Sequence, residues 1–354
     1  MKSAIKPFPP LPAEDLDSVF LGARSCWEEI RNQAILFSGG TGFVGTWLLE
    51  SFAEANTRLG LGAHAVVISR DPGLFSRKLP HLANRADISL IGGDVRTFAF
   101  PPGRFRFIIH AAATTAPAGN PHAAYDMLDT IVSGTRHMLD VAARCGAQKF
   151  LLVSSGAVYG VQPPAMSHLT EEYLGAPDPL LAASAYGQGK RIAEQMCALA
   201  AEASGIEVKI ARCFSFVGPH LPLDAQFAIG NFLCDAMADR PIRIRGNGNS
   251  FRSYLYAADL ARWLWTILFR GGALRAYNVG SRNTLTIAEL ARLVQITVGG
   301  PNAIQIGGPT GPGLSASHYV PEVTRAVEEL GLGETLPLPE AIRRTVAWWR
   351  VAAA

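Results

Sequence analysis

Lysine and cysteine are scarce in this sequence. Only six of the 354 residues are lysines, and the five cysteines are scattered through the chain, at positions 26, 145, 197, 213 and 234. Their number is odd, and no two of them form a Cys-x-x-Cys pair. This pattern excludes a fully paired disulfide framework, argues against a zinc site and indicates free thiols. We therefore expect a cytoplasmic protein that holds no metal.

A strong net charge and a long apolar run are also missing. The net charge is +3, and the chain has no basic run and no basic helical stripe, so nothing indicates a nucleic-acid partner. No apolar run reaches the roughly 18 residues of a membrane span. The proline-rich start, "MKSAIKPFPPLP", lacks the apolar core of a signal peptide. We therefore expect no membrane partner.

From Ala34 onward, short apolar runs alternate with segments of helical periodicity. After the first run at Ala34, the apolar runs recur at 65–70, 88–95, 105–113, 149–155 and 207–212. Short buried strands that alternate with helices are typical of a parallel sheet covered on both faces. We predict an α/β fold: a Rossmann-type doubly wound parallel sheet, with a smaller mixed α/β part towards the C-terminus.

A glycine loop follows the first of these strands. Gly39, Gly42 and Gly45 fit the spacing Gly-x-x-Gly-x-x-Gly, between an apolar run and a helical segment. Glycine permits the tight turn and lets the backbone approach a pyrophosphate, which the free N–H groups of the helix N-terminus then bind. This context predicts a dinucleotide site. Its candidate cofactor contacts are Gly39, Thr41, Gly42, Phe43, Val44 and Gly45.

The end of the second strand bears on which dinucleotide is bound. NAD-binding proteins usually place an acidic residue there to bind the ribose hydroxyls. This chain has Ser69 and Arg70, which suit a 2′-phosphate and favour NADP. Asp71 follows at the next position and keeps NAD as an alternative.

Lys190 stands four positions after Tyr186, in a stretch where a helix is expected to begin. Four residues are about one helical turn, so the two side chains share a face. Upstream, Ser155 ends a predicted strand in "VSSGAVYG". Two further stretches follow strands: Asp94 and Val95, where an adenine ring could be held, and the small residues Ala111, Ala112 and Ala113, suited to lying under the cofactor.

From about Ala34 to the C-terminus, this combination resembles the extended short-chain dehydrogenase/reductase family, in particular its nucleotide-sugar epimerases, dehydratases and reductases. The resemblance implies that Ser155, Tyr186 and Lys190 are catalytic. A free tyrosine has a pKa near 10, so Lys190 and the nicotinamide ring would have to lower it by about 3 units, roughly 4 kcal/mol. Tyr186 would then exchange a proton with a sugar hydroxyl that Ser155 orients. Lys190 would also hold the nicotinamide ribose.

The resemblance also implies a nucleoside diphosphate sugar as the substrate. Arg252 stands where the family contacts the diphosphate, and Asn231 where it often contacts the nucleotide. Ser215 stands where the family usually has asparagine, and we add Thr114 as a further substrate contact. A second arginine of the family is missing, and its neighbourhood holds His318 and Tyr319. Family members are often dimers that pair through the helix after the catalytic tyrosine, so we expect a homodimer.

The residues after Ser155 bear on the reaction. Sugar 4,6-dehydratases of the family carry acidic residues there, and the sugar-acid decarboxylases usually keep a glutamate, whereas this chain has Gly156 and Ala157. These two residues cannot transfer a proton, so elimination and decarboxylation are disfavoured unless an acid–base residue at 168–172 reaches the site. We expect an epimerase that transiently oxidises a sugar carbon, with a 4-ketosugar reductase as the alternative. A non-enzymatic cofactor-sensing protein would have no need of Ser155, Tyr186 and Lys190.

These expectations divide the chain into three parts. Residues 1–33, with prolines that bar a helix near the start, form an N-terminal extension that packs against the main body or a partner subunit. Residues 34–212 form the NAD(P)-binding Rossmann domain, to which 252–281 return. Residues 213–251 and 282–354 form the substrate-binding part.

Overall fold

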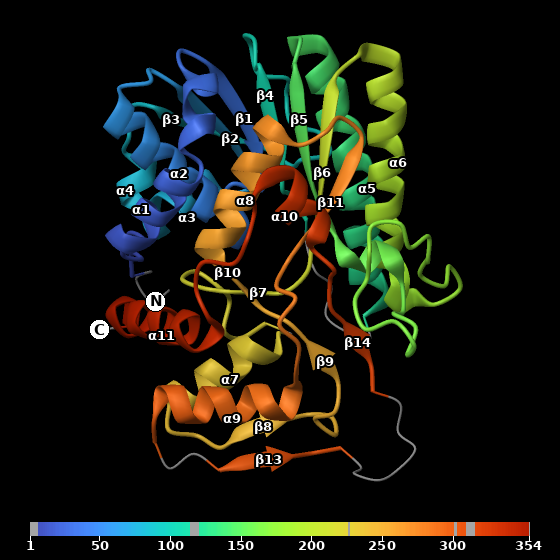
Figure 1. Cartoon of the computed structure of the whole chain (residues 1–354). Helices are drawn as coiled ribbons and strands as arrows, with labels where there is room; N and C mark the ends of the chain where they lie inside the picture. Colours follow the sequence, from blue (N-terminus) through green and yellow to red (C-terminus); the bar gives the residue numbers. More distant parts are fainter. Residues whose placement is uncertain (1–5, 114–119, 226, 301–302, 309–315, 354) are drawn as a thin grey trace.

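A parallel sheet of seven strands organises the protein (Figure 1). The computed structural model describes residues 6–113, 120–225, 227–300, 303–308 and 316–353. The strand order across the sheet is β11-β6-β5-β4-β1-β2-β3, and every neighbouring pair is parallel. The strands are β1 (Ala34–Ser38), β2 (His64–Ser69), β3 (Ile88–Gly92), β4 (Phe107–His110), β5 (Lys149–Ser155), β6 (Glu207–Cys213) and β11 (Arg275–Val279).

Helices cover both faces of this sheet because side chains alternate between the faces along each strand. On β1, Ile35 and Phe37 join the core that includes α2 (Phe43–Leu59) and α8 (Ala257–Arg270). Leu36, between them, joins the core on the opposite face, which includes α5 (Pro121–Cys145) and α6 (Ala185–Ser204). The predicted doubly wound α/β fold is confirmed.

The N-terminal segment packs against this same chain. After the proline-rich residues, α1 (Ala13–Gly22) and the short 3₁₀ helix η1 (Arg24–Ile30) lie against α2 and α8. Trp27 is fully buried, with its ring centroid 5.2 Å from that of Trp265. Asp15 is also buried, and its carboxylate accepts hydrogen bonds from Tyr256 and Arg344. These contacts join the N-terminal helix to the body of the protein and to the C-terminal helix.

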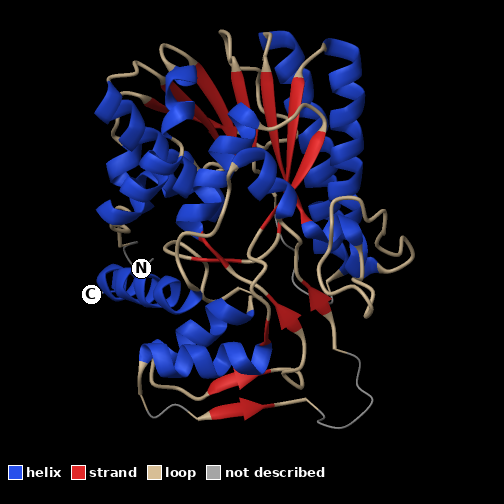
Figure 2. Cartoon of the chain, viewed as in Figure 1, coloured by secondary structure: helices blue, strands red, loops and turns tan. Residues whose placement is uncertain are grey.

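Smaller elements form a second layer beyond one end of the sheet (Figure 2). Its pairs of short strands are β7 (Phe216–Val217) with β10 (Leu255–Tyr256), and β8 (Ile242–Ile244) with β13 (Ile304–Ile306). A three-stranded sheet consists of β9 (Phe251–Arg252), β12 (Leu285–Thr286) and β14 (His318–Tyr319). The helices of this half are α7 (Ala228–Met237), α9 (Ile287–Val298), α10 (Thr324–Leu330) and α11 (Leu338–Ala353).

The remaining short helices connect strands of the large sheet: α3 (Pro72–Lys78), α4 (Pro80–Ala83), η2 (Gly156–Tyr159) and η3 (Ala182–Ser184). Strand β11, at 275–279, returns the chain to the large sheet beside β6 after the excursion through the smaller elements. The division into domains proposed from the sequence stays a prediction. Within the described ranges, no helix has both the length and the apolar character needed to cross a membrane.

Candidate active site

A cleft of about 1550 Å³ lies between the carboxyl ends of the strands and the smaller elements. In open α/β sheets, ligands bind at this edge of the sheet. Many of the residues singled out from the sequence line the cleft. On the cofactor side these are Gly39, Gly42, Phe43, Val44, Ala111 and Ala113, and elsewhere they are Ser155, Tyr186, Lys190, Ser215, Asn231 and Arg252.

The glycine loop has the geometry of a dinucleotide cradle. Gly39 has φ +73°, and a Cβ there would lie 2.5 Å from backbone atoms of Ala111 and Ala112. A Cβ on Gly45 would lie 2.3 Å from backbone atoms of Gly39 and Gly40, so the third glycine lets helix α2 pack on the loop. Gly42 instead is exposed, and a Cβ there would lie 3.5 Å from the carbonyl oxygen of Gly39, an ordinary contact distance. The loop therefore leaves room for a pyrophosphate at the N-terminus of α2.

Three of the predicted cofactor contacts in and beside the loop do not line the cleft. Thr41 is exposed and does not line the cleft, and Gly45 is buried beneath the loop. Ala112 also lies behind the cleft lining, against Gly39.

The residues assigned to the adenosine end lie outside the cleft lining, near the carboxyl ends of β2 and β3. Ser69 and Val95 are buried, and Arg70 is exposed. Asp71, the alternative ribose ligand, caps helix α3 by accepting the N–H of Leu74 at 2.8 Å. The carboxylate of Asp71 is therefore already engaged, whereas Arg70 makes no hydrogen bond or ion pair with any other described residue.

Asp94 is held by an ion pair that the sequence reading missed. Arg96 donates to both carboxylate oxygens of Asp94, at 2.8 and 2.9 Å. The same guanidinium binds Asp126 and Asp129 on α5. Arg96 holds the pKa of Asp94 below its usual range. This cluster fixes the loop after β3 against helix α5, and no spacing rule in the sequence signalled it.

Ser155, Tyr186 and Lys190 come together where β5 ends and α6 begins. The Oγ of Ser155 accepts the N–H of Ala157 at 3.1 Å. Lys190 is 3% exposed, and its Nζ donates to the carbonyl of Val153 at 2.7 Å. The same Nζ lies 5.9 Å from the ring centroid of Tyr186, as expected for side chains one helical turn apart.

Burial governs the electrostatics of this centre. It raises the pKa of Tyr186 to about 12, although a hydrogen bond with Ser155 acts in the opposite direction. It also lowers the pKa of Lys190 to about 8. The shift of Tyr186 is opposite in sign to the one that the sequence argument required. At pH 7 the protein alone thus keeps Tyr186 as a proton donor, and use as a base would need about 7 kcal/mol of stabilisation.

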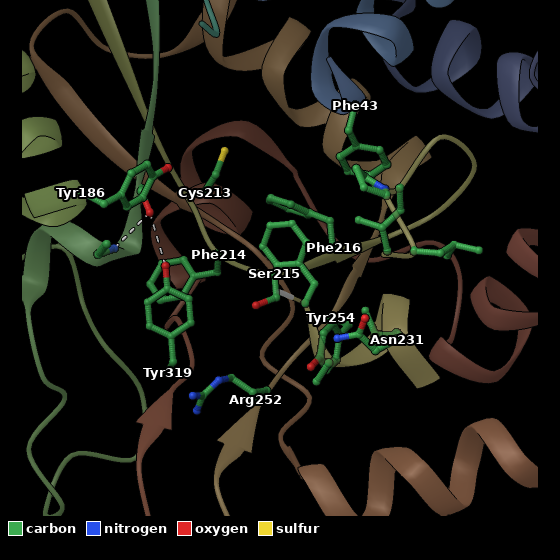
Figure 3. A pocket seen from close by; sticks show the side chains of 18 of the residues that line it. Phe43, Tyr186, Cys213, Phe214, Ser215, Phe216, Asn231, Arg252, Tyr254 and Tyr319 are labelled. Carbon is green, nitrogen blue, oxygen red and sulfur yellow. Dashed lines mark hydrogen bonds between the residues drawn. The ribbon is translucent and has the colours of Figure 1, made fainter. Parts of the chain in front are cut away.

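Phe214 and Tyr319 form an aromatic wall of the cleft that the sequence analysis did not predict (Figure 3). The Oη of Tyr319 lies 3.4 Å from the Oγ of Ser155. The ring of Tyr319 packs on Phe214, with centroids 4.7 Å apart. A Cβ on Gly156 would come within 2.6 Å of the Phe214 ring, so the ring occupies the space a side chain at 156 would need. The only signal in the sequence was that the second arginine expected from the family is missing from the neighbourhood of Tyr319.

The residues proposed to bind substrate continue the cleft wall from Tyr319, because Arg252 is the register partner of Tyr319 on the neighbouring strand. Arg252 extends from β9, Asn231 from α7, and Ser215 from the link between β6 and β7. The guanidinium of Arg252 donates to the carbonyl of Phe251 at 2.7 Å. Arg243 and Arg245 also line this wall, from the alternating stretch "PIRIRGNG" that the sequence analysis had not assigned to the site. Thr114 lies outside the described residues.

The candidate acid–base residues at 168–172 face elsewhere. The carboxylate of Glu171 accepts the N–H of Asn278, and Glu172 pairs with Arg325. His168 is bonded through its ring to the carbonyl of Arg282, at 3.0 Å. None of the three lines the described part of the cleft. From the sequence, elimination required one of these residues to reach the site, and none of the three does so in the structure.

A half-buried ion pair fixes helix α6 to the sheet behind the site. Glu194, one turn after Lys190, accepts from Arg212 of β6 at 2.7 Å. The Oγ of Ser154, the neighbour of Ser155, donates to the same carboxylate at 2.6 Å. One carboxylate thus joins the helix that carries Tyr186 and Lys190 to the strand that carries Ser155.

The fold and this site define a dinucleotide-binding protein with a Ser-Tyr-Lys centre. The sequence profile of the NAD dependent epimerase/dehydratase family matches residues 35–280, more than half of the chain. The chain belongs to this family. It is 29% identical over 318 residues to UDP-glucuronic acid decarboxylase 1 of Xenopus tropicalis, covering 89% of this chain and 72% of that protein. It is 30% identical over 318 residues to UDP-glucuronic acid decarboxylase 1 of Arabidopsis thaliana, covering 89% and 69%.

Solved structures of nucleotide-sugar enzymes share the fold. UDP-glucose 4-epimerase from Thermotoga maritima, solved with UDP-glucose, has a TM-score of 0.78 at 20% identity, covering 91% of this chain and 100% of that one. UDP-glucuronic acid 4-epimerase from Bacillus cereus, solved with NAD, has a TM-score of 0.75 at 18% identity, with coverages of 91% and 100%. At these identities the likeness concerns the fold alone.

Proposed function

We infer that the protein is an NAD(P)-dependent nucleotide-sugar epimerase that acts by transient oxidation at one sugar carbon, C4. The observation that carries this proposal is the surroundings of Ser155. Phe214 fills the space beside Gly156, and Ala157 has no ionisable group. Tyr186 is thus the proton-transfer group at the centre. Tyr186 can exchange the proton of one hydroxyl, which is what oxidation and re-reduction at C4 require. Elimination would need a second acid–base group to move protons at C5 and C6.

Each residue of the centre has one task in this reaction. Ser155 holds the C4 oxygen through its hydroxyl. Tyr186 accepts the proton of that oxygen during oxidation. It returns the proton after the keto sugar has rotated in the cleft to present its other face. Lys190, charged below a pKa of about 8, stabilises the Tyr186 phenolate from one helical turn away. A bound nicotinamide supplies the hydride chemistry and a positive charge, and the open glycine loop fits its dinucleotide.

The substrate is a nucleoside diphosphate sugar. Arg252 lies at the cleft wall facing the centre and is suited to bind the diphosphate. Asn231 lies farther along the same wall and is suited to bind the base or ribose, and Ser215 lies between them (Figure 3). The solved UDP-glucose 4-epimerase with bound UDP-glucose supports this class of ligand.

The preferred cofactor is NADP. Arg70 is exposed, near the carboxyl end of β2, while Asp71 is engaged in capping α3. A guanidinium suits a 2′-phosphate better than a free ribose. The family description and the relative solved with NAD support nicotinamide dinucleotides in general.

Two other reactions have an observation in their favour. A 4-ketosugar reductase would consume NADPH, which Arg70 favours. A sugar-acid decarboxylase is favoured by the names of the sequence relatives. Against the latter, Ala157 stands where decarboxylases of the family usually keep a glutamate.

One assay separates the three reactions. The purified protein is incubated with UDP-, dTDP-, GDP- and CDP-hexoses, each with catalytic NAD(P)⁺, and the products are identified by NMR. We expect the C4 epimer, with no net change in NAD(P)H and no release of CO₂. Stoichiometric NADPH oxidation on a 4-keto sugar would instead establish a reductase, and CO₂ from a nucleotide-linked uronic acid would establish a decarboxylase. Either result would overturn the epimerase proposal.

A further inference from the structure

We propose that Tyr319 is a specificity-determining residue that reserves the reacting end of the cleft for uncharged sugars and excludes uronic acids. The inference rests on the proposed function, because it assumes that the sugar's C4 lies at Ser155 and Tyr186. It concerns a residue that carried no assigned role in the sequence.

The charges that line the cleft are distributed unevenly. Within the described residues, the charged lining side chains are Lys190, Asp224, Asp235, Arg240, Arg243, Arg245 and Arg252. All except Lys190 and Arg252 come from the segment 224–245, which includes α7 and β8 of the smaller half, beyond the end of the large sheet (Figure 1). In the part of the chain that the structure describes, the wall beside Ser155 is neutral: Gly156 is covered by Phe214, and Ala157 lines the cleft.

The two remaining cations, Lys190 and Arg252, both donate to backbone carbonyls of the protein. Lys190 directs its Nζ to the carbonyl of Val153, 2.7 Å away. Arg252 is the register partner of Tyr319 on the neighbouring strand β9, with its guanidinium 6.0 Å from the ring centroid of Tyr319 (Figure 3). It is the hydroxyl of Tyr319, and not this guanidinium, that lies 3.4 Å from the Oγ of Ser155.

Tyr319 itself supplies no charge. Burial raises its pKa, so its hydroxyl stays neutral at physiological pH and can offer one hydrogen bond. The ring is fixed by its packing on Phe214, at 4.7 Å between centroids. The hydroxyl therefore has a set position beside Ser155.

This arrangement disfavours a carboxylate next to C4. In a uronic acid the carboxylate is attached to C5, one bond from the reacting carbon, so it would enter this neutral wall. A carboxylate that loses its water without gaining a cation is strongly disfavoured, whereas a hydroxymethyl or methyl group is accepted. The relatives named for UDP-glucuronic acid act, by their names, on such an acid.

The test compares binding of a matched pair of ligands. Titration with UDP, dTDP, GDP, CDP and ADP first identifies the preferred base. The glucose and glucuronic acid esters of that nucleoside diphosphate are then titrated calorimetrically into the full-length protein with NADP⁺ present. We expect the wild type to bind the glucose ester at least about tenfold more tightly. Tyr319→Arg, which places a guanidinium beside Ser155, should reduce that ratio by about tenfold or more.

Two variants serve as controls. Tyr319→Phe keeps the wall neutral and should change the ratio by less than about threefold. Val161→Arg adds the same charge at an 85% exposed position outside the cleft and should leave the ratio unchanged. Equal or tighter binding of the glucuronic acid ester by the wild type would overturn the inference, as would an unchanged ratio in a folded Tyr319→Arg protein. If that variant does not fold, the wild-type ratio decides alone.

The outcome is separable from that of the proposed reaction. Binding ratios do not depend on turnover, so a protein that prefers the glucose ester but forms no epimer would retain this specificity and lose the epimerase assignment. A protein that binds none of the five nucleoside diphosphates would overturn both.

Discussion

The ring of Phe214 lies so close to the Cα of Gly156 that a Cβ at position 156 would come within 2.6 Å of it. Phe214 thus occupies the space that an acid–base side chain at position 156 would need. We predict that Gly156→Ala lowers the free energy of unfolding by about 1–3 kcal/mol, because the ring must move or the backbone must shift. Urea denaturation measures this change.

Gly246→Ala is the matched control, since a Cβ at Gly246 would meet no atom within 4 Å. It should change the free energy of unfolding by less than about 0.5 kcal/mol. In the Phe214→Ala background, Gly156→Ala should become at least about 1 kcal/mol less costly. Equal costs of Gly156→Ala in both backgrounds would contradict the contact between Phe214 and Gly156.

Removal of the Tyr186 hydroxyl tests the proposed centre. Tyr186→Phe should lower kcat/KM by about 10³-fold, the range for losing a general acid–base group. Cofactor binding should remain within about threefold of the wild type, because the glycine loop is untouched. Steady-state kinetics and calorimetry give the two quantities. Tyr125→Phe, at a 76% exposed site on α5, is the control. A Tyr186→Phe enzyme that retains a tenth of the activity would exclude Tyr186 as the proton-transfer group.

The elements of the large sheet could be predicted because each is a local pattern. The apolar run predicted at 149–155 has the bounds that the structure gives to β5, because the hydrophobic pattern lies within the segment itself. The meeting of Ser155 with Tyr186 was implied by the resemblance to the family, since Ser155 ends a strand and Tyr186 begins a helix farther along the chain.

The surroundings of Ser155 could not be predicted, because they depend on packing between distant segments. Tyr319 reaches Ser155 across 164 positions in the chain, from a strand of two residues. A strand that short has no periodicity to read. The pKa of Tyr186 likewise depends on how completely the folded chain buries it. A spacing of four residues predicts that Tyr186 and Lys190 are neighbours, but it does not predict their burial.

His110 should make the protein sensitive to acid. It is completely buried at the end of β4, and burial lowers its pKa from 6.5 to about 3. The hydroxyl of Thr135 donates to the carbonyl of Ile131, so the Nε2–H of His110 donates to Thr135, and Nδ1 accepts from Ser38. Both ring nitrogens are thus used by the neutral form.

The unfolded state therefore binds this proton more readily than the folded state. The stability linked to His110 is fully present above pH 6.5 and is lost as the pH falls towards 3, by about 1.4 kcal/mol per pH unit and about 5 kcal/mol in all. His110→Gln should flatten the dependence of unfolding free energy on pH between 6 and 4, measured by urea denaturation. His122→Gln, an exposed site on α5, is the control. Equal slopes for wild type and His110→Gln would refute the assignment.

Arg70 should decide the choice between the two dinucleotides. If its guanidinium binds the 2′-phosphate, Arg70→Ala should raise the Kd for NADPH by about tenfold or more and leave the Kd for NADH within about twofold. Fluorescence titration of the reduced cofactors provides both values. Arg136→Ala removes an arginine from an exposed ion pair on α5 and should alter neither. A wild type that prefers NADH, or a variant that loses both cofactors equally, would point instead to NAD.

Helices α5 and α6 should form the contact of a homodimer. They pack side by side on one face of the sheet, and they expose apolar side chains outward: Tyr125 on α5, and Ile192 and Leu199 on α6. Ile192 and Leu199 are two helical turns apart and share one face, which gives a second copy an apolar stripe to cover. We expect a dimer by size-exclusion chromatography with light scattering.

A buried charge would disrupt such a contact, because the carboxylate would lose water without gaining a partner. Ile192→Glu should therefore shift the protein to the monomer at micromolar concentration. Ile296→Glu makes the same change at a 78% exposed position on α9 and should leave the dimer intact. If both variants remained dimeric, the contact would have to lie on another face. If the wild type were already monomeric, the apolar stripe on α6 would not mediate self-association.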